Sequence, residues 1–419
     1  MGGLEALRQL LGQSHHARPD DLPEMVMRAA PLVNATAMII YLVDHQQRVL
    51  LPLLGGTAPH RELFGVDGTL GGRAFTQIAA AVSDTGPDGV RLWLPLIDGA
   101  ERMGVLEVVL DTVPGDDVVD DCATVAALLA ELVITRSLYS DTIELLRRRE
   151  PMRLAAEMLR AQLPPLTFST GHLVISGILE PAYDVAGDAF DYAVNADTAH
   201  VALFDAVGHG SAGGMRPVIL ASLALAGYRN ARRAGLDLTA TYHHIDAAVR
   251  GYDRAGLITA VLAELDQRSG VLRVISAGHP GGIVIRDGKV VKTLPTPTAL
   301  PVVMGDKQAP VVVEEALEPG DRLLLYTDGI TEARAPDGTR FGLDRLIDFA
   351  VKAAADRLRP PETVRRLVHA ILEHQDDRLQ DDATVLLAEW LTPAPQPSDT
   401  ELPTASPGTP LDLPEQGQQ

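Results

Sequence analysis

Four apolar segments of strand length in this chain each meet an aspartate at one end. The clearest is residues 201–204, which stop at Asp205 and open into a loop with a glycine-flanked histidine, His209. The other three segments place Asp188, Asp328 and Asp381 in the same relation to an apolar run. A fold that brings these ends to one edge of a sheet must gather four carboxylates there. This requirement constrains the architecture more than any other feature of the sequence.

Carboxylates at one sheet edge repel each other unless a cation lies between them. Several aspartates with few neutral partners favour hard, oxygen-liking ions, so the sequence predicts Mn²⁺ or Mg²⁺. Two such ions a few ångströms apart can hold a water, lower its pKa and clamp a phosphoryl group for in-line attack. Hydrolysis of a phosphate ester is the natural use of such a site.

Residues 154–387 resemble the bacterial SpoIIE/RsbU-type serine/threonine phosphatases, a branch of the PP2C superfamily. The resemblance depends on six motifs that occur in order and together span more than half of the chain. They are Ala155-Ala156-Glu157-Met158 with Leu163-Pro164-Pro165, Gly187-Asp188 with Asp191, Asp205 with Gly208-His209-Gly210, Ala277-Gly278-His279-Pro280, Pro319-Gly320-Asp321 running into Tyr326-Thr327-Asp328-Gly329, and Asp381-Asp382-Ala383-Thr384.

The resemblance implies a role for each acidic residue. Asp205 would bridge two metal ions, Asp188 would bind one of them, and Asp328 and Asp381 would bind the other. The backbone carbonyl of Ala206 would complete the ligand shell. For any one of these aspartates alone, a turn cap at a strand end is the alternative.

Further polar residues are candidates for roles around the four aspartates. Asp191 is a candidate for a water-mediated ligand. His209 could protonate the leaving serine or threonine oxygen, and the alternative is that it orders the loop. We expect His279 to orient the site from a neighbouring turn. Asp376 and Asp377 are expected on a solvated loop, because only Asp381-Asp382 runs directly into an apolar strand; Asp382 is then a hydrogen-bond partner.

The resemblance also implies an α+β fold for residues 166–390, a PP2C-like four-layer αββα sandwich with helices on both sides of two stacked sheets. The spacing of apolar residues agrees with it. Strands are predicted at residues 173–178, 200–204, 257–265, 271–276, 282–286, 311–315, 322–326 and 384–389, and helices at 215–234, 242–252, 343–354 and 361–374. Residues 391–419 are rich in Pro, Ser, Thr and Gln, which predicts a disordered tail.

Residues 1–137 resemble a GAF domain, with the order helix, strand pair, helix, strand pair, closing helix. This predicts a GAF-like α/β sensor domain; a sensory or dimerising domain without a small-molecule ligand is the alternative. Helical spacing continues over residues 123–149, and a second helix is predicted at 152–163 after Pro151. We interpret residues 138–165 as a signalling connector that pairs with its twin in a homodimer, with a plain tether as the alternative.

Charge and cysteine content argue against a nucleic-acid-binding protein and against a small disulfide-bonded secreted protein. The 419 residues carry a formal net charge of -20, without the Lys and Arg blocks that nucleic-acid binding requires. The single cysteine, Cys122, has no partner for a disulfide within the chain. No leader-like N-terminus and no membrane-spanning apolar run is recognisable, so the sequence predicts a soluble, cytoplasmic protein without membrane contact.

Together these features predict a metal-dependent protein serine/threonine phosphatase in bacterial signalling. The family resemblance implies that its substrate is a phosphorylated anti-sigma-factor antagonist and that the GAF-like domain controls it. One alternative is a catalytically weak docking protein that uses a phosphatase-like domain to bind a partner. Another is an enzyme that hydrolyses a small phosphate ester.

Overall fold

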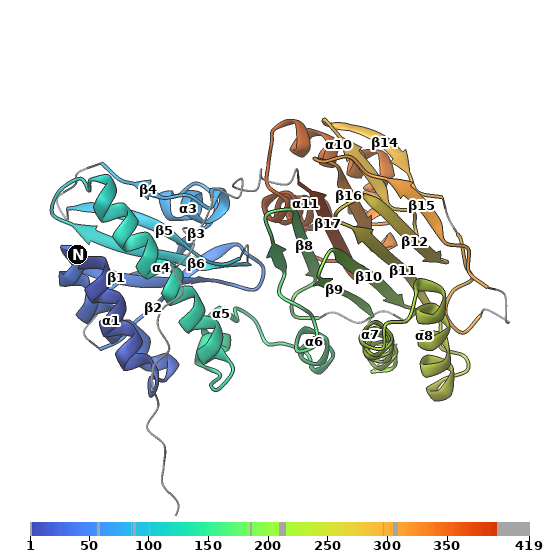
Figure 1. Cartoon of the computed structure of the whole chain (residues 1–419), viewed down its shortest axis with the longest axis horizontal. Coiled ribbons are helices and arrows are strands. Elements are labelled where there is room, and N and C mark those ends of the chain that lie inside the picture. The colour runs from blue at the N-terminus through green and yellow to red at the C-terminus, as the bar shows by residue number, and fades with distance from the viewer. Residues whose placement is uncertain are drawn as a thin grey trace, which may run out of the picture.

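The computed structural model describes residues 2–56, 59–84, 86, 89–99, 101–184, 187–208, 215–295, 297–304 and 309–391. An N-terminal and a C-terminal domain have separate sheets and are joined by a segment that carries α5 (Thr142–Arg147) and α6 (Leu154–Arg160) (Figure 1). The tail predicted at 391–419 lies outside the described residues, except for Leu391.

The N-terminal domain is built on one antiparallel sheet with the strand order β3-β2-β1-β6-β5-β4. The strands are β1 (Ala35–Val43), β2 (Val49–Leu53), β3 (Phe64–Gly65), β4 (Ala81–Val82), β5 (Val90–Asp98) and β6 (Glu101–Leu110). The helices are α1 (Gly2–Ser14), η1 (Pro19–Asp21), α2 (Leu22–Ala29), η2 (Ala30–Val33), α3 (Leu70–Gln77) and α4 (Asp116–Ser137). Leu129 of α4 shares a buried core with Leu106 on one face of the sheet, and Phe75 of α3 shares another with Trp93 on the opposite face.

The main helices and strands of this domain follow the predicted order. The GAF-like relationship and the domain boundaries remain predictions.

The C-terminal domain contains two antiparallel sheets. The first has the order β15-β12-β11-β10-β9 and the second the order β14-β13-β16-β17-β8-β7. The strands are β7 (Thr167–Ser169), β8 (Leu173–Glu180), β9 (Asp188–Asn195), β10 (Thr198–Ala206), β11 (Ile258–Asp266), β12 (Val271–Ala277), β13 (Ile283–Arg286), β14 (Lys289–Thr293), β15 (Val313–Ala316), β16 (Arg322–Tyr326) and β17 (Ala383–Trp390).

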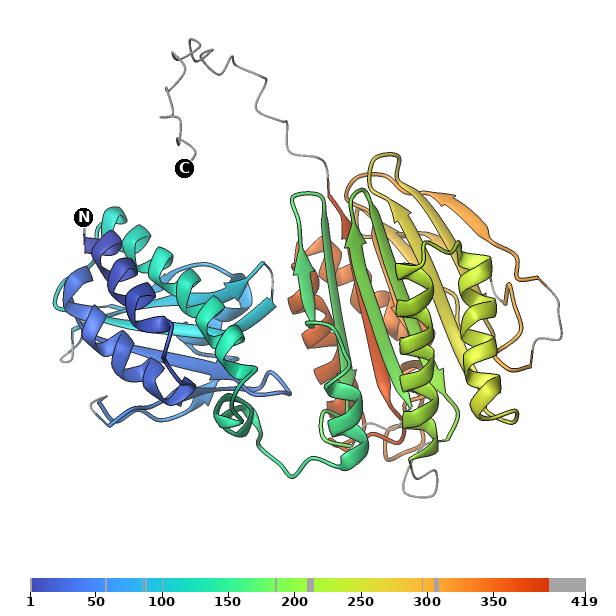
Figure 2. The same ribbon diagram turned by 60° about the horizontal axis from the view of Figure 1, so that its bottom comes forward.

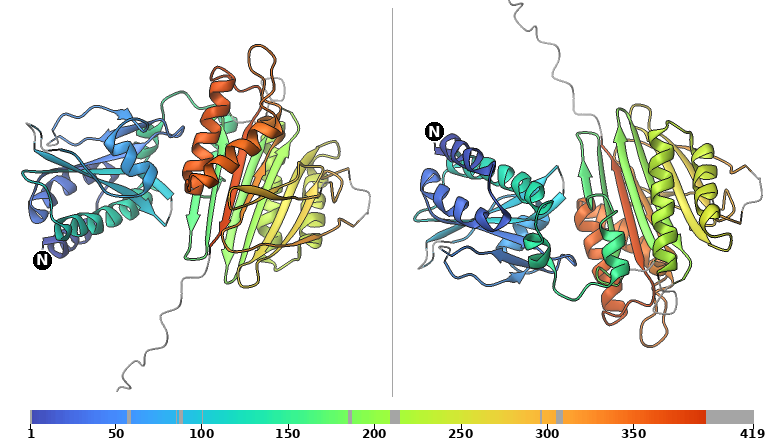
Figure 3. Two further views of the ribbon diagram at one scale, coloured as in Figure 1. Left: turned by 90° about the horizontal axis from the view of Figure 1, so that it is seen from above. Right: turned by 90° about the horizontal axis from the view of Figure 1, so that it is seen from below.

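Helices cover the outer face of each sheet. The helices of this domain are α7 (Arg216–Arg233), α8 (Leu238–Tyr252), α9 (Asp328–Thr331), α10 (Gly342–Ala355) and α11 (Pro360–His374). Figure 2 shows α7 and α8 side by side over the five-stranded sheet, and Figure 3 shows α10 and α11 on the opposite side of the domain. The predicted α+β, four-layer αββα sandwich is therefore confirmed.

The alternation of side chains along β16 shows why the sequence forms layers. Leu323 and Leu325 belong to the core between the two sheets, whereas Leu324 and Tyr326 pack with residues of α10 and α11. Successive residues of a strand face opposite sides, so a continuous apolar run serves both cores.

No strand is predicted between residues 178 and 200, but the structure has one around Asp188. Residues 188–195 form β9, which pairs with β10 along its whole length and brings Asp188 opposite Asp205. Both Asp188 and Asp191 are buried in this strand. Threonine hydroxyls bind Asp188, and two arginines pair with Asp191. A local apolar pattern could not reveal such a strand.

In the structure the helical spacing of residues 123–149 corresponds to two helices with a break between them. Helix α4 ends at Ser137, and α5 begins only at Thr142. The Ser140 hydroxyl accepts a hydrogen bond from the Thr142 amide at 3.2 Å, and the Thr142 hydroxyl donates to Asp20. Side chains that hydrogen-bond the backbone locally compete with the helix, which accounts for the break.

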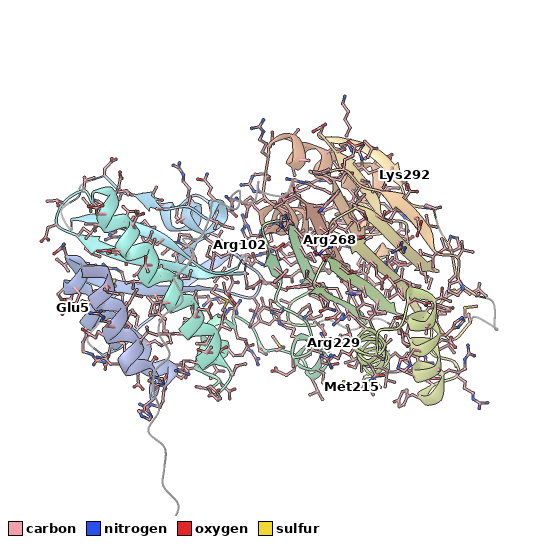
Figure 4. All side chains as sticks on the ribbon, viewed as in Figure 1. Glu5, Arg102, Met215, Arg229, Arg268 and Lys292 are labelled. Atoms are coloured by element: carbon pink, nitrogen blue, oxygen red, sulfur yellow. The ribbon has the colours of Figure 1, made fainter. Side chains whose placement is uncertain are left out.

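The two domains contact each other through buried charged groups. Arg102 of β6 lies between the domains (Figure 4), where its Nη1 donates to Glu362 Oε2 of α11 at 3.1 Å. Arg365 donates to Asp67 of the N-terminal domain at 2.7 Å. Sheet β1 to β6 is thereby joined directly to the outer helix layer of the C-terminal domain.

No helix within the described ranges is both long enough and apolar enough to cross a membrane.

Candidate active site

Asp188 and Asp205 face each other across two adjacent strands. They are register partners of β9 and β10, so their side chains lie on the same face of the sheet, within about 5 Å at Cβ. Asp188 is 3% exposed and Asp205 is half-buried. The predicted proximity of these two carboxylates is confirmed.

Two threonine hydroxyls hold the Asp188 carboxylate from the opposite sheet. Thr327 Oγ1 and Thr384 Oγ1 donate to Asp188 Oδ2 at 2.7 and 2.6 Å. Asp382 Oδ2 accepts from the amides of Gly187 and Asp188 at 2.6 and 3.0 Å, which confirms the predicted role of Asp382 as a hydrogen-bond partner. Both threonines adjoin predicted ligands within motifs, but the sequence does not show where their hydroxyls point.

Asp328 and Asp381 reach the same edge from the six-stranded sheet. Asp328 begins α9 directly after β16, and Asp381 precedes β17. A Cβ added to Gly329 would lie 1.9 Å from the carbonyl oxygen of Asp382. Only glycine permits this approach, which brings the two aspartate-bearing loops into contact.

The electrostatics show that the four carboxylates act on one another. Burial, followed by the charges of Asp328, Asp381 and Asp382, raises the pKa of Asp205 to about 7. Burial and the charges of Asp205 and Asp382 likewise raise the pKa of Asp188 well above its usual value. In the described part of the chain, Asp188, Asp205 and Asp328 form no ion pair with Lys, Arg or His. Such a set of repelling carboxylates fits a site for divalent cations.

The carboxylate side chains do not form a complete coordination sphere in this structure. Within the residues that the structure describes, no three His, Cys, Asp or Glu side chains form a group that could hold one ion. Binding would therefore require the carboxylates to rotate toward the ion. Ala206 ends β10 beside Gly187, where a Cβ would lie 2.3 Å from the Ala206 carbonyl oxygen, and its role as a ligand remains a prediction.

Asp191 does not face this site, so its predicted role as a water-mediated ligand is wrong. Its Oδ1 accepts from Arg229 of α7 at 2.7 Å, and its Oδ2 accepts from Arg232 at 2.9 Å. Asp191 is three residues from Asp188 along the strand, and residues at that spacing lie on opposite faces. The ion pairs attach α7, on which Arg229 is marked in Figure 4, to the outer face of the sheet.

His279 links β11, where Thr259 is the register partner of Asp205, to the end of β16, two residues before Asp328. Its Nε2 lies 3.1 Å from the carbonyl oxygen of Tyr326, and its Nδ1 lies 2.7 Å from Thr259 Oγ1. Because a carbonyl oxygen only accepts, we assign the ring hydrogen to Nε2, and Nδ1 then accepts from Thr259. Thr259 Oγ1 also lies 3.4 Å from Asp205 Oδ2. The expectation that His279 orients the site is confirmed, and burial lowers its pKa to about 4, which keeps it neutral.

The remaining predicted residues lie away from the carboxylates or outside the described structure. His209, the predicted general acid, lies outside the described residues. Asp376 and Asp377 are exposed, and Asp377 pairs with Arg48 of the N-terminal domain, which confirms their place on a solvated loop.

Comparison with known families gives a match within the C-terminal domain. Residues 195–391 match the family model described as Stage II sporulation protein E (SpoIIE). The match covers somewhat less than half of the chain. The match includes Asp205, Asp328 and Asp381, whereas Asp188 precedes it.

Two curated proteins are similar to part of this chain. The chain is 24% identical over 220 residues to Phosphoserine phosphatase RsbU of Bacillus subtilis (strain 168), covering 51% of this chain and 62% of the relative. It is 26% identical over 163 residues to Protein IcfG of Synechocystis sp., covering 39% of this chain and 24% of the relative. The chain thus spans less than two thirds of either relative.

A solved structure is also similar to part of this chain. It is the SiaA-PP2C domain of Pseudomonas aeruginosa, with 26% identity and a TM-score of 0.47, covering 57% of this chain and 94% of that chain.

Proposed function

We propose that this protein is a metal-dependent protein serine/threonine phosphatase. The observation that carries the proposal is the convergence of Asp188, Asp205, Asp328 and Asp381 at one edge of the two sheets, where burial and neighbouring carboxylates raise the pKa of the first three. The SpoIIE match and the similarity to a phosphoserine phosphatase support the same reaction class.

The carboxylates would hold two divalent ions, Mn²⁺ or Mg²⁺. In this proposal Asp205 bridges both ions, Asp188 binds one, Asp328 and Asp381 bind the other, and the Ala206 carbonyl completes the shell. When bound, such a pair supplies Lewis acidity to a phosphoryl group and lowers the pKa of a water. Thr327 and Thr384 fix one oxygen of Asp188 by hydrogen bonds, which leaves its other oxygen to face an ion.

The leaving oxygen of the substrate needs a proton. We propose His209 as its donor, because an imidazole titrates near neutral pH and the loop follows the bridging Asp205 directly. His279 does not fit this role, because it is buried and both of its ring nitrogens are engaged.

The proposed substrate is a phosphorylated anti-sigma-factor antagonist, in a pathway controlled through the GAF-like domain. The similarity to RsbU supports this class of substrate. The buried contacts of Arg102 and Arg365 support control by the N-terminal domain, because they connect that domain to the C-terminal domain without an intervening flexible segment.

The test of the enzyme proposal is hydrolysis of a phosphoserine peptide by the full-length protein, with and without Mn²⁺. We expect release of phosphate that requires the metal and is abolished by chelation. A small phosphate ester such as p-nitrophenyl phosphate, assayed in parallel, should give a lower kcat/KM than the peptide. Tight metal binding without turnover of either substrate would favour the docking alternative.

Metal binding should depend steeply on pH near neutrality. The pKa of Asp205 rises from 3.8 to about 7 on folding, so the folded chain holds this proton more tightly than the unfolded chain. This group therefore lowers the stability of the metal-free protein as the pH rises through that interval, whereas a bound cation removes the repulsion.

We expect Mn²⁺ to raise the melting temperature more at about pH 8 than at about pH 6. Melting curves with Mn²⁺ and with chelator, for the native protein and Asp205→Asn, test this expectation. The variant should lose most of the pH-dependent difference. Equal stabilisation of the native protein at both pH values would contradict the assigned role of Asp205.

The homodimer remains a proposal, supported by exposed apolar side chains along the connector. Leu138, Tyr139, Leu145 and Leu154 are all exposed. The double replacement Leu138→Ser/Tyr139→Ser should shift sedimentation from dimer to monomer, because it removes apolar area that a partner would bury. Val113→Ser, an exposed apolar position outside the connector, is the matched control. A native protein that sediments as a monomer would refute this proposal.

A further inference from the structure

The outer face of the six-stranded sheet changes from apolar to charged at the end away from the aspartates. Tyr326 and Leu324 of β16 pack with α10 and α11, but the next residue on that face is Arg322. Its register partners are Glu389 of β17 and Ile285 of β13. At about 3.3 Å per residue, Arg322 lies about 13 Å from Tyr326 along the strand, and the Asp328 loop lies further still.

A hollow of about 490 Å³ opens over this charged row. Its charged lining consists of three arginines, Arg322, Arg357 and Arg359, and two acidic residues, Asp287 and Glu389. Three positive and two negative charges leave a formal charge of +1. The lining of the hollow is therefore positive, whereas the chain as a whole has a formal net charge of -20.

Arg322 is buried but only partly satisfied. It is 8% exposed, and its Nε donates to Glu389 Oε1 at 3.0 Å. Its buried Nη1 has no hydrogen-bond partner among the described residues. A buried donor without an acceptor destabilises the folded protein, and more so when the donor is charged. An acceptor brought by a ligand would remove this cost.

Arg357 and Arg359 supply accessible positive charge at the same hollow. Both are exposed and lie in the turn between α10 and α11. Neither side chain forms an ion pair with another residue in the part of the chain that the structure describes. Helix α11 begins with Pro360 and Pro361, which have no amide hydrogen, so guanidinium groups rather than helix amides are the donors on offer.

We propose that this hollow binds a phosphate-sized oxyanion, either as free phosphate or as the phosphoryl group of a small organic molecule. The guanidinium fork matches the geometry of a phosphoryl group better than any other cationic side chain. Arg322 would form the floor of the site, and Arg357 and Arg359 would close over the anion. The site is separate from the four aspartates and goes beyond the proposed hydrolysis.

The location connects the hollow to the contact between the domains. Helix α11 starts beside the hollow and carries Glu362 and Arg365, which bind Arg102 and Asp67 of the N-terminal domain. An anion bound at the hollow would therefore lie next to the first turn of the helix that joins the two domains.

Calorimetric titration of the full-length protein without metal tests the site. The titration buffer contains a chelator. Without metal the carboxylates of the four aspartates repel anions, so the aspartate site does not bind the added phosphate. The ligands are inorganic phosphate and, separately, ribose 5-phosphate. We expect saturable binding of at least one of them with a stoichiometry near one per chain. Preference for inorganic phosphate would identify the free anion, and preference for ribose 5-phosphate would identify an organic phosphoryl group.

Variants distinguish anion binding at the hollow from an effect of the protein's net charge. Arg357→Ala/Arg359→Ala should weaken binding about tenfold, because it removes two exposed cations without touching the core. Arg8→Ala/Arg233→Ala changes the net charge equally at exposed positions elsewhere and should bind like the native protein. Arg322→Gln should weaken binding further; circular dichroism would verify its fold.

Two outcomes overturn the proposal: no saturable binding of either ligand, or equal weakening by the hollow variant and the control variant. Asp205→Asn distinguishes this proposal from the catalytic one. It should bind the anion like the native protein even where it has lost hydrolysis.

Discussion

Replacing Asp205 with asparagine is expected to lower kcat/KM for a phosphoserine peptide by about a thousandfold, or about 4 kcal/mol of transition-state stabilisation. Asp205 lies opposite Asp188 in the strand register and is coupled by charge to Asp328 and Asp381. A neutral amide cannot bridge two cations as a carboxylate does, so both proposed metal positions weaken together. Phosphate release at saturating Mn²⁺ measures the effect.

The variant should remain folded, because asparagine has nearly the same shape and removes one charge from a repelling set. Its metal-free melting temperature above neutral pH should equal or exceed that of the native protein. Asp376→Asn is the matched control, since Asp376 is exposed and has a left-handed backbone, φ 49°, that asparagine adopts readily. A native rate in Asp205→Asn would remove Asp205 from the active site.

The strands that end at Asp205 and Asp328 could be predicted because each combines an unbroken apolar run with an abrupt polar end. The run at β16 serves two cores at once, which is why it contains no polar residue between Arg322 and Tyr326. For such strands a continuous apolar run in the sequence is enough to predict that both faces of the strand are buried between layers.

The partners of the buried carboxylates could not be predicted in the same way. Asp188 and Asp191 are both aspartates and lie three residues apart in the same strand. Threonine hydroxyls between the sheets bind Asp188, whereas arginines of α7 bind Asp191. Which face a strand residue occupies depends on register, and register depends on residues far along the chain. The error over Asp191 has this origin.

The contact between the domains could not be predicted from sequence patterns either. Arg102 and Glu362 are separated by 260 positions in the sequence, and each lies in an element with an ordinary apolar pattern. Arg102 also lies over the ring of Phe75, with 4.5 Å between its Cζ and the ring centroid. Burial of an arginine between two domains is visible only once the domains are placed together.

Replacing Glu362 with alanine is expected to lower the free energy of unfolding by about 3–5 kcal/mol. Glu362 is 3% exposed and accepts hydrogen bonds from Arg102 at 3.1 Å, from Arg365 at 2.9 Å and from Arg366 at 2.6 Å. Its removal leaves two buried guanidinium groups without their shared acceptor. A buried charge without a counter-charge destabilises the protein by more than the intact ion pair stabilises it. The expected decrease in the free energy of unfolding is therefore large.

Urea denaturation followed by circular dichroism measures this loss. Glu373→Ala, at an exposed position on the same helix α11, is the control and should change the free energy of unfolding by less than about 0.5 kcal/mol. Because Arg102 belongs to β6 and Glu362 to α11, the variant should also expose the domain junction to proteolysis before either domain unfolds. If Glu362→Ala were as stable as Glu373→Ala, the two domains would not be held together by this ion cluster in solution.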